Sequence, residues 1–307
     1  MRISVQTAPA VSSNNIDGGY KNIADAGFEA VDFNIDCFMN VNKLQTATEL
    51  KRLSIYEKSV DEIVEYMRPH LDAMKKYGIA IAQAHAPFPP YFAGRKDILD
   101  YMIEVYKKII AVCDIIDCPY LVIHGIKHFP SSVEPYAVSR QLDAYMYDSL
   151  IDTLKDKKVV VCLENLPTNS NGKFIESICC NPHDAARQID ELNEKAGREA
   201  FGFCLDTGHM LLVGKRFETF VPILGSRLKT LHLNDNDGVL DRHLAPFAGQ
   251  LNWEDFINSM RDVGYKGDLS FETCAQIAKP GIDEELTREI LRHICTVGRI
   301  FRKKILK

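Results

Sequence analysis

The feature that most constrains the fold is a repeated alternation of short apolar runs with longer amphipathic segments. The apolar runs predict buried strands, and the segments between them predict helices. Strands that alternate with helices form a parallel sheet, and eight such units close naturally into a barrel. The eight runs span residues 2–8, 28–35, 79–86, 120–125, 158–165, 201–207, 228–235 and 268–273.

An open, doubly wound sheet is the structural alternative to a barrel. Such folds usually carry a glycine-rich phosphate-binding turn after the first strand, whereas "TAPAVSSNN" contains no glycine. We therefore predict an α/β fold, a single (β/α)8 TIM-barrel domain over residues 1–307. The segment Asp36–Ser59 is an enlarged loop after the second strand, which we expect to be partly helical and a candidate lid over the mouth of the barrel.

Helix boundaries can also be read from the sequence. Asn252 is suited to cap the helix that follows it, while Gly27, Gly78 and Gly264 stand where helices should end. The predicted helices are Asp61–Tyr77, Asp97–Asp117, Ser139–Lys155, Pro182–Ala196, Trp253–Val263 and Asp283–Phe301.

Composition narrows the class of protein. The net charge of −5 gives no sign of a nucleic-acid or anionic-membrane partner, and no apolar stretch is long enough to span a bilayer. "MRISVQTAPA" has one basic residue and no long apolar run, so we expect no signal peptide and a cytoplasmic location. The nine cysteines include no CxxC pair and indicate reduced thiols, and we favour that reading over a redox role for Cys179 and Cys180.

Histidines and carboxylates gather where the predicted strands end. A single strand-end histidine is typical of a hydrogen-bonded core residue, and the stretch from Leu228 to Trp253 alone could be a solvated loop. Six consecutive strands, however, present such residues at the mouth of one barrel, where the working site of this fold lies. The nine candidates are His85, His124, Glu164, Asp206, His209, His232, Asp241, His243 and Glu272.

The convergence of these side chains predicts a metal site. Unpaired carboxylates would repel one another and lose solvation on burial, and a divalent cation removes both penalties. Mixed nitrogen and oxygen ligands suit zinc or manganese best, with magnesium or cobalt as alternatives. The sequence leaves the identity of the metal open.

Several motifs in this chain resemble the xylose isomerase-like TIM-barrel superfamily of sugar isomerases and epimerases. Endonuclease IV-type apurinic-site endonucleases belong to the same superfamily. The matching pieces are "HAPF", "VIHG", "CLENLP", "CLDTGHM", "LHLNDNDGVLDRHLAPFAGQLNW" and "LSFET", which cover the chain from the third strand to the eighth in family order.

The resemblance implies a ligand set for between one and three ions. A central metal would be held by Glu164, Asp206, His232 and Glu272. In the endonuclease branch a second metal would use His85 and His124 with Glu164, and a third would use His209, Asp241 and His243.

The resemblance also implies a reaction. In the sugar branch Glu164 and Glu272 would flank the substrate and transfer a proton through a cis-enediolate, which makes the chain a metal-dependent isomerase or epimerase. "ENLP" and "DTGH" look like sugar-branch forms, the loop from His232 to Asp241 is short, and no Lys/Arg-rich strip adjoins it. An endonuclease, an inosose-type dehydratase and a barrel that only binds a sugar remain the alternatives.

We expect a small sugar, sugar phosphate, inosose or other polyol as the partner, in preference to nucleic acid or membrane. The sequence decides neither the sugar nor the oligomeric state. The candidate substrate-binding residues are Phe88, Lys127, Asn165, Arg242 and Trp253.

Overall fold

The computed structural model describes residues 1–47, 49–50, 54–128, 136–278 and 284–307. Within these residues all eight predicted strands are present, and every pairing between them is parallel. The strands are β1 (Ile3–Gln6), β2 (Ala30–Phe33), β3 (Ala80–His85), β4 (Tyr120–Val122), β5 (Val160–Glu164), β8 (Phe201–Asp206), β9 (Leu228–His232) and β10 (Leu269–Phe271).

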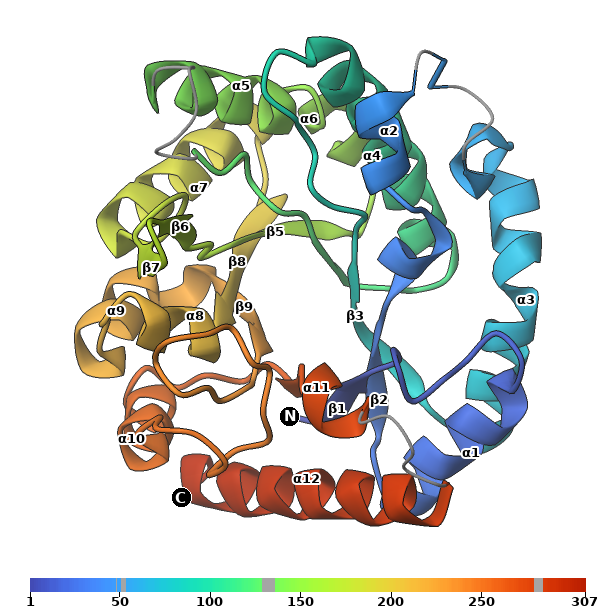
Figure 1. Ribbon diagram of the computed structural model, residues 1–307, viewed down its shortest axis with the longest axis vertical. Helices are drawn as coiled ribbons and strands as arrows, with labels where there is room; N and C mark the ends of the chain where they lie inside the picture. The colour runs from blue at the N-terminus through green and yellow to red at the C-terminus, as the bar shows by residue number, and fades with distance from the viewer. Residues whose placement is uncertain (48, 51–53, 129–135, 279–283) are drawn as a thin grey trace.

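The sheet curls until its two edge strands meet. Its order is β10-β1-β2-β3-β4-β5-β8-β9, and a parallel bridge between Leu233 and Phe271 joins β9 to β10. The amide of Leu233 donates to the carbonyl of Ser270 at 2.8 Å, and the amide of Glu272 donates to the carbonyl of Leu233 at 3.0 Å. The prediction of a (β/α)8 barrel is confirmed, with helices surrounding the strands (Figure 1).

The helices pack their apolar faces against the outside of the barrel. The predicted start and stop signals are seen at α1, α3 and α10: Gly27 and Gly78 adopt the left-handed conformation that ends a helix, and Asn252 caps α10. The helices are α1 (Ile16–Ala26), α3 (Val60–Tyr77), α4 (Lys96–Ile115), α5 (Tyr136–Asp148), α6 (Ile151–Leu154), α7 (Pro182–Ala196), α8 (Thr207–Leu212), α9 (Phe217–Leu224), α10 (Trp253–Asp262), α11 (Cys274–Ile277) and α12 (Glu284–Ile305), with a short 3-10 turn η3 (Gly225–Arg227) before β9.

Two details differ from the sequence prediction, and a third falls outside the described residues. The helix predicted over Ser139–Lys155 is divided into α5 and α6, and the hydroxyl of Ser149 donates to the carbonyl of Tyr145 at the break. The loop after β5 contains an antiparallel hairpin, β6 (Thr168–Ser170) with β7 (Lys173–Ile175), that the sequence analysis missed. The predicted first residue of the last helix, Asp283, lies outside the described residues.

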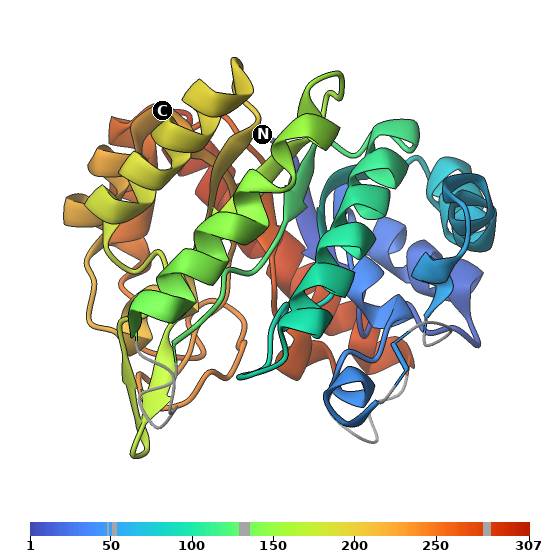
Figure 2. The same ribbon diagram turned by 90° about the horizontal axis from the view of Figure 1, so that it is seen from above.

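The enlarged loop after β2 is partly helical, as predicted. It contains η1 (Ile35–Phe38), α2 (Asn42–Thr46) and η2 (Ile55–Glu57). The guanidinium of Arg95 ties it to the start of α4 by donating to the carbonyls of Gln45 at 2.8 Å and Ala47 at 3.2 Å. In Figure 2, α2 and the β6–β7 hairpin project from the side of the molecule opposite the two chain termini, which is the mouth of the barrel.

The core consists of the strands and the inner faces of the helices. A smaller apolar cluster of Val122, Val160, Cys162 and Cys204 lies beside Tyr120. All nine cysteines are free. In the described part of the chain, no helix combines the length and apolar character needed to cross a bilayer.

Candidate metal centre

The strand ends bring the predicted ligands to one level of the barrel. Glu164 and Asp206 are the last residues of β5 and β8, and the register of β8 with β9 pairs Asp206 with His232. His85 ends β3, and Glu272 follows β10 directly. Because parallel strands finish at the same edge, residues far apart in the sequence converge here.

Two of the carboxylates predicted for a central ion lie on either side of one nitrogen of the predicted histidine ligand. His232 Nδ1 lies 3.5 Å from Glu164 Oε2 and 3.5 Å from Glu272 Oε2. Asp206 has ligand atoms within 4.8 Å of those of His232 and Glu272. The second carboxylate oxygen of Asp206 accepts a hydrogen bond from Asn234 at 2.7 Å, which fixes this side chain in place.

The first flanking set brings two imidazoles to Glu164. The Nε2 atoms of His85 and His124 are 3.0 Å apart, and His124 Nε2 lies 3.1 Å from Glu164 Oε2. Two ring nitrogens that face each other at this distance leave little room for anything but a shared proton or a shared cation.

The second flanking set joins α8 to the loop after β9. His209 Nε2 lies 3.2 Å from Asp241 Oδ2, and His243 Nε2 lies 3.4 Å from Asp241 Oδ1. His243 adopts a positive φ of 45°, an uncommon conformation for this residue that turns its ring toward Asp241 and Glu272.

The donor atoms fit divalent cations. Two ligands bound to one ion at about 2.0–2.2 Å lie roughly 3.0–3.5 Å apart, and each set contains separations in that range, while His85 Nε2 lies 3.9 Å from Glu164 Oε2. His232 Nδ1 is buried and makes no hydrogen bond, so it has an unused lone pair or proton at the centre of the site. The mixed nitrogen and oxygen donors suit zinc or manganese.

The electrostatics of the mouth also favour a cation. Burial lowers the pKa of His124 to about 4. Burial also lowers the pKa of His243, but the nearby carboxylates of Glu272 and Asp241 outweigh this effect and raise the pKa to about 11. Burial, together with the repulsion from Glu272 and Glu164, raises the pKa of Asp206 to about 7. The mouth therefore concentrates negative charge that positive charge must compensate.

In His85 and His209, the ring nitrogen Nδ1 contacts a backbone carbonyl, while Nε2 faces the other candidate ligands. His85 Nδ1 lies 2.9 Å from the carbonyl of Ala86, and His209 Nδ1 lies 2.9 Å from the carbonyl of Asn165. Such contacts select the tautomer and orient the nitrogen that would face an ion.

The sequence analysis missed two carboxylates near the site, the buried Asp32 and the half-buried Asp36. Asp32, in the middle of β2, contacts the imidazole of His232. Asp36, in η1, has a buried Oδ1 atom without a hydrogen-bond partner. For Asp32 the sequence did contain a signal: this aspartate lies inside the apolar run "FEAVDFNI", and a charged residue in a buried strand needs a specific partner.

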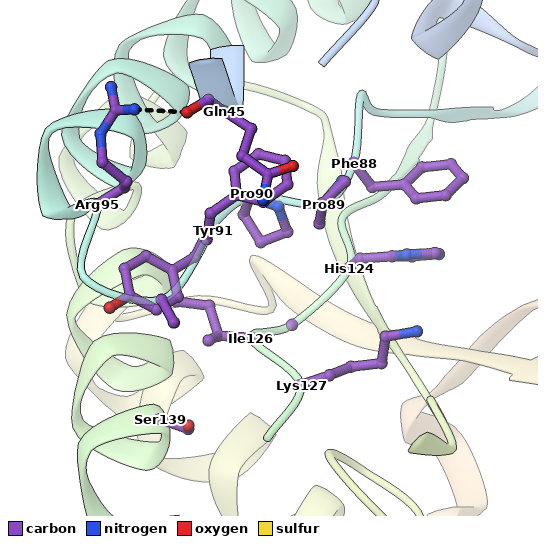
Figure 3. Close-up of a pocket in the computed structure, with 13 residues that line it drawn as sticks. Gln45, Phe88, Pro89, Pro90, Tyr91, Arg95, His124, Ile126, Lys127 and Ser139 are labelled. Carbon is purple, nitrogen blue, oxygen red and sulfur yellow. Dashed lines mark hydrogen bonds between the residues drawn. The ribbon is translucent and has the colours of Figure 1, made fainter. Parts of the chain in front are cut away.

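Phe88 and Lys127 line a cavity of about 680 Å³ beside His124 (Figure 3). Phe88 is 44% exposed, and the centre of its ring is 4.3 Å from that of His124. In Figure 3 the side chains of Phe88, His124 and Lys127 all extend in the same direction, away from Tyr91 and Ser139. These two candidate substrate residues therefore adjoin the ligand set.

The other three candidate substrate residues have structural contacts instead. Both amide atoms of Asn165 bond to the backbone of Asp206, at 2.8 and 2.9 Å, which joins the ends of β5 and β8. Arg242 is paired with Asp237 on the surface of the loop. A contact of Asn165 or Arg242 with substrate therefore stays a prediction, since the structure shows only these other contacts for them.

Trp253 lies in the core and not at the mouth. Its side chain is 2% exposed and stacks on Phe301 of α12. Its indole nitrogen donates to Asp235 Oδ2 at 2.9 Å. The prediction that Trp253 binds substrate is therefore wrong, because the ring has no surface to offer.

Several solved structures with the same architecture are named as sugar epimerases. The 3-keto-D-glucoside 4-epimerase YcjR from E. coli aligns over 96% of this chain and 99% of its own, with a TM-score of 0.69 and 14% identity. The D-psicose 3-epimerase with D-tagatose from Clostridium cellulolyticum H10 aligns over 98% and 99%, with a TM-score of 0.67 and 14% identity. At these identities the likeness shows a common fold.

Sequence comparison identifies the family. Among curated proteins, the uncharacterized protein y4fM of Sinorhizobium fredii is 36% identical over 72 residues, which are 24% of this chain. The alignment spans 23% of the length of that relative. The family model described as xylose isomerase-like TIM barrel matches residues 20–296. The chain therefore belongs to the xylose isomerase-like TIM-barrel family.

Proposed function

We propose that the protein is a divalent-metal-dependent isomerase or epimerase of a small keto sugar or inosose. The observation that carries this proposal is the position of two carboxylates, Glu164 and Glu272, each 3.5 Å from the same buried nitrogen of His232. Two carboxylates around one point are suited to remove and return a proton on a substrate held between them.

The chain's own residues supply the acid and base. Glu164 extends from β5 and Glu272 from the end of β10, so they approach the centre of the mouth from different strands. A divalent ion held by Glu164, Asp206, His232 and Glu272 would supply electrostatic stabilisation to the oxygens of a developing enediolate. One glutamate takes the proton from the carbon beside the carbonyl, and the other delivers a proton to the carbon that becomes the new stereocentre or hydroxyl-bearing carbon.

The cavity beside His124 provides the space for the rest of the substrate. Phe88 offers an apolar face suited to the C–H face of a sugar, and Lys127 is an ammonium for which no acceptor lies within hydrogen-bonding distance among the described residues. Arg95, the other cation of the cavity, is already bonded to Asp97 and to two backbone carbonyls. One available cation supports an uncharged polyol over a sugar phosphate, which usually requires several donors.

The solved structures give independent support. Several structural neighbours are epimerases of keto sugars, including 3-keto-D-glucoside, D-psicose and L-ribulose. These activities belong to those proteins, and the shared architecture makes the same class of substrate the first to test here.

Hydrogen exchange in D2O tests the reaction without knowledge of the product. A ketose or inosose turned over by the protein should exchange its carbon-bound proton next to the carbonyl, because enolisation removes that proton whichever isomer is formed. Exchange should be lost in Glu164→Gln and Glu272→Gln, while Glu199→Gln on the surface serves as the matched control.

The endonuclease alternative gives a different result. The side chains predicted for the two flanking ions, and three of the four predicted for the central ion, lie close together, which is compatible with three ions. Phe88 is exposed at the mouth, as a residue that wedges into a base stack would need to be. Such an enzyme would nick an abasic-site duplex, with affinity that falls steeply as salt rises. Nicking at catalytic concentration, with no exchange on any keto sugar tested, would reject the isomerase.

A further inference from the structure

Asp32 is a buried carboxylate that belongs to none of the ligand sets. It lies in β2, between Val31 and Phe33, and is 2% exposed. Its Oδ2 atom is 3.1 Å from His232 Nε2 and accepts a hydrogen bond from Gln83 Nε2 at 2.7 Å. Asp32 therefore contacts the side of the imidazole opposite to the one that faces Glu164 and Glu272.

The strand register explains why these side chains meet. Asp32 pairs with Gln83 across β2 and β3, and with Gln6 across β1 and β2, so the three residues form a row inside the barrel. Gln83 is fully buried, and its amide also approaches the carbonyl of Leu231 at 3.4 Å. Asp32 is thus held on a rigid part of the barrel and not on a loop.

The contact determines how His232 can act. A carboxylate can only accept a hydrogen bond, so the atom that faces Asp32 must be a protonated Nε2. In a neutral imidazole this leaves the lone pair on Nδ1, the buried atom that has no hydrogen-bond partner. The geometry directs that lone pair at the point between the two glutamates.

The alternative is that Asp32 only fills the interior of the barrel. Burial of a carboxylate carries a large loss of solvation, and its Oδ1 atom has no hydrogen-bond partner. An aliphatic side chain would pack the same space without that penalty. The interior position is therefore better explained by what the carboxylate does for His232.

We propose that Asp32 is a positioning residue that presents His232 Nδ1 as a metal ligand, with Gln83 holding Asp32 in place. The inference rests on the proposed function in one respect, because it assumes a divalent ion at Nδ1. Partners of this kind ordinarily change metal affinity by about 10- to 100-fold when they are removed.

Cobalt titration measures this effect without an activity assay. Asp32→Leu removes the acceptor while keeping the volume, and it should weaken Co2+ binding by about 10- to 100-fold and change the visible absorption of the bound ion. Asp32→Asn can keep an oxygen facing His232 and Gln83, and its affinity should stay close to that of the wild type. Ser4→Ala, which removes another buried hydrogen-bonding side chain of the barrel interior, is the control and should bind Co2+ normally.

The variants test the role of Asp32, and the wild type tests the metal centre on which that role depends. If folded Asp32→Leu binds Co2+ with the affinity and spectrum of the wild type, Asp32 has no positioning role. If Asp32→Leu does not fold, Gln83→Leu should shift the affinity in the same direction, and normal binding there overturns the inference. A wild-type protein that binds no divalent ion would reject the metal centre itself, and the inference with it.

Discussion

At the scale of single residues, Asp235 holds the loop that carries Asp241 and His243. Its Oδ1 atom accepts the amides of Asn236 and Leu251, and its Oδ2 atom accepts the amide of Phe247 and the indole of Trp253, at 2.9–3.1 Å. Asp235→Asn replaces one acceptor oxygen by a donor and leaves buried N–H groups unpaired. We expect a loss of about 2–4 kcal/mol in the free energy of unfolding, measured by urea denaturation.

The same variant should affect the second flanking set. Because the loop positions Asp241 and His243, the number of Co2+ ions bound should fall while binding at the central set persists. Asp262→Asn, on the surface at the end of α10, is the control and should change neither quantity. Unchanged stability in Asp235→Asn would mean that the four hydrogen bonds contribute little to the loop.

At the scale of helices and strands, Asp143 of α5 connects three elements beneath the cavity. It accepts the amide of Ile126 at 2.8 Å and the side-chain amide of Gln188 of α7 at 2.8 Å. Burial raises the pKa of Asp143 to about 6. Since the folded-state pKa lies above the unfolded value, the protonated carboxyl stabilises the fold below about pH 4, and this contribution is lost as the pH rises through about 6.

Asp143→Asn should remove this pH dependence. The difference in unfolding free energy between variant and wild type should be small near pH 4 and should favour the variant by roughly 2–3 kcal/mol at pH 8. Asp184→Asn at the start of α7, an exposed aspartate away from the buried network of Asp143, is the control. If the difference in unfolding free energy between Asp143→Asn and the wild type does not change with pH, the carboxyl of Asp143 has the same pKa in the folded and unfolded states.

The elements themselves were largely legible in the sequence. Apolar runs bounded by glycines and capping residues located all eight strands and most helices, because those signals are local. The division of α5 from α6 and the β6–β7 hairpin were not predicted, since neither has a strong local signal. Among site residues, strand ends pointed to the nine candidate ligands, whereas Asp32 and Asp235 depend on partners that only the folded barrel supplies.

At the scale of the whole molecule, the candidate metal centre is a property of the closed barrel. Its side chains come from β3, β5, β8, β9, α8, the loop after β9 and residues just beyond β4 and β10, so the complete set is assembled only when six of the eight strands are in place. A ligand that binds only such an assembled site stabilises the folded state as a whole. The extent of the single domain over residues 1–307 remains a prediction.

Because the metal site exists only in the folded barrel, divalent ions should raise the midpoint of thermal unfolding. An ion present at about 100 times its dissociation constant adds about 2.7 kcal/mol to the stability of the fold, which for a chain of this size corresponds to a rise of about 4 °C in the unfolding midpoint. EDTA should reverse the rise, and excess Mn2+ or Zn2+ should restore it. Glu272→Gln is the matched variant, since it removes one ligand of the central set and leaves the ligands of both flanking sets in place. Its midpoint should rise less on addition of metal than that of the wild type. If the midpoint of the wild type does not respond to ions, the cluster at the mouth is balanced by protonated histidines alone. If Glu272→Gln responds as the wild type does, the central ion is held without Glu272, and the opposed glutamates proposed for proton transfer would have to be reassigned.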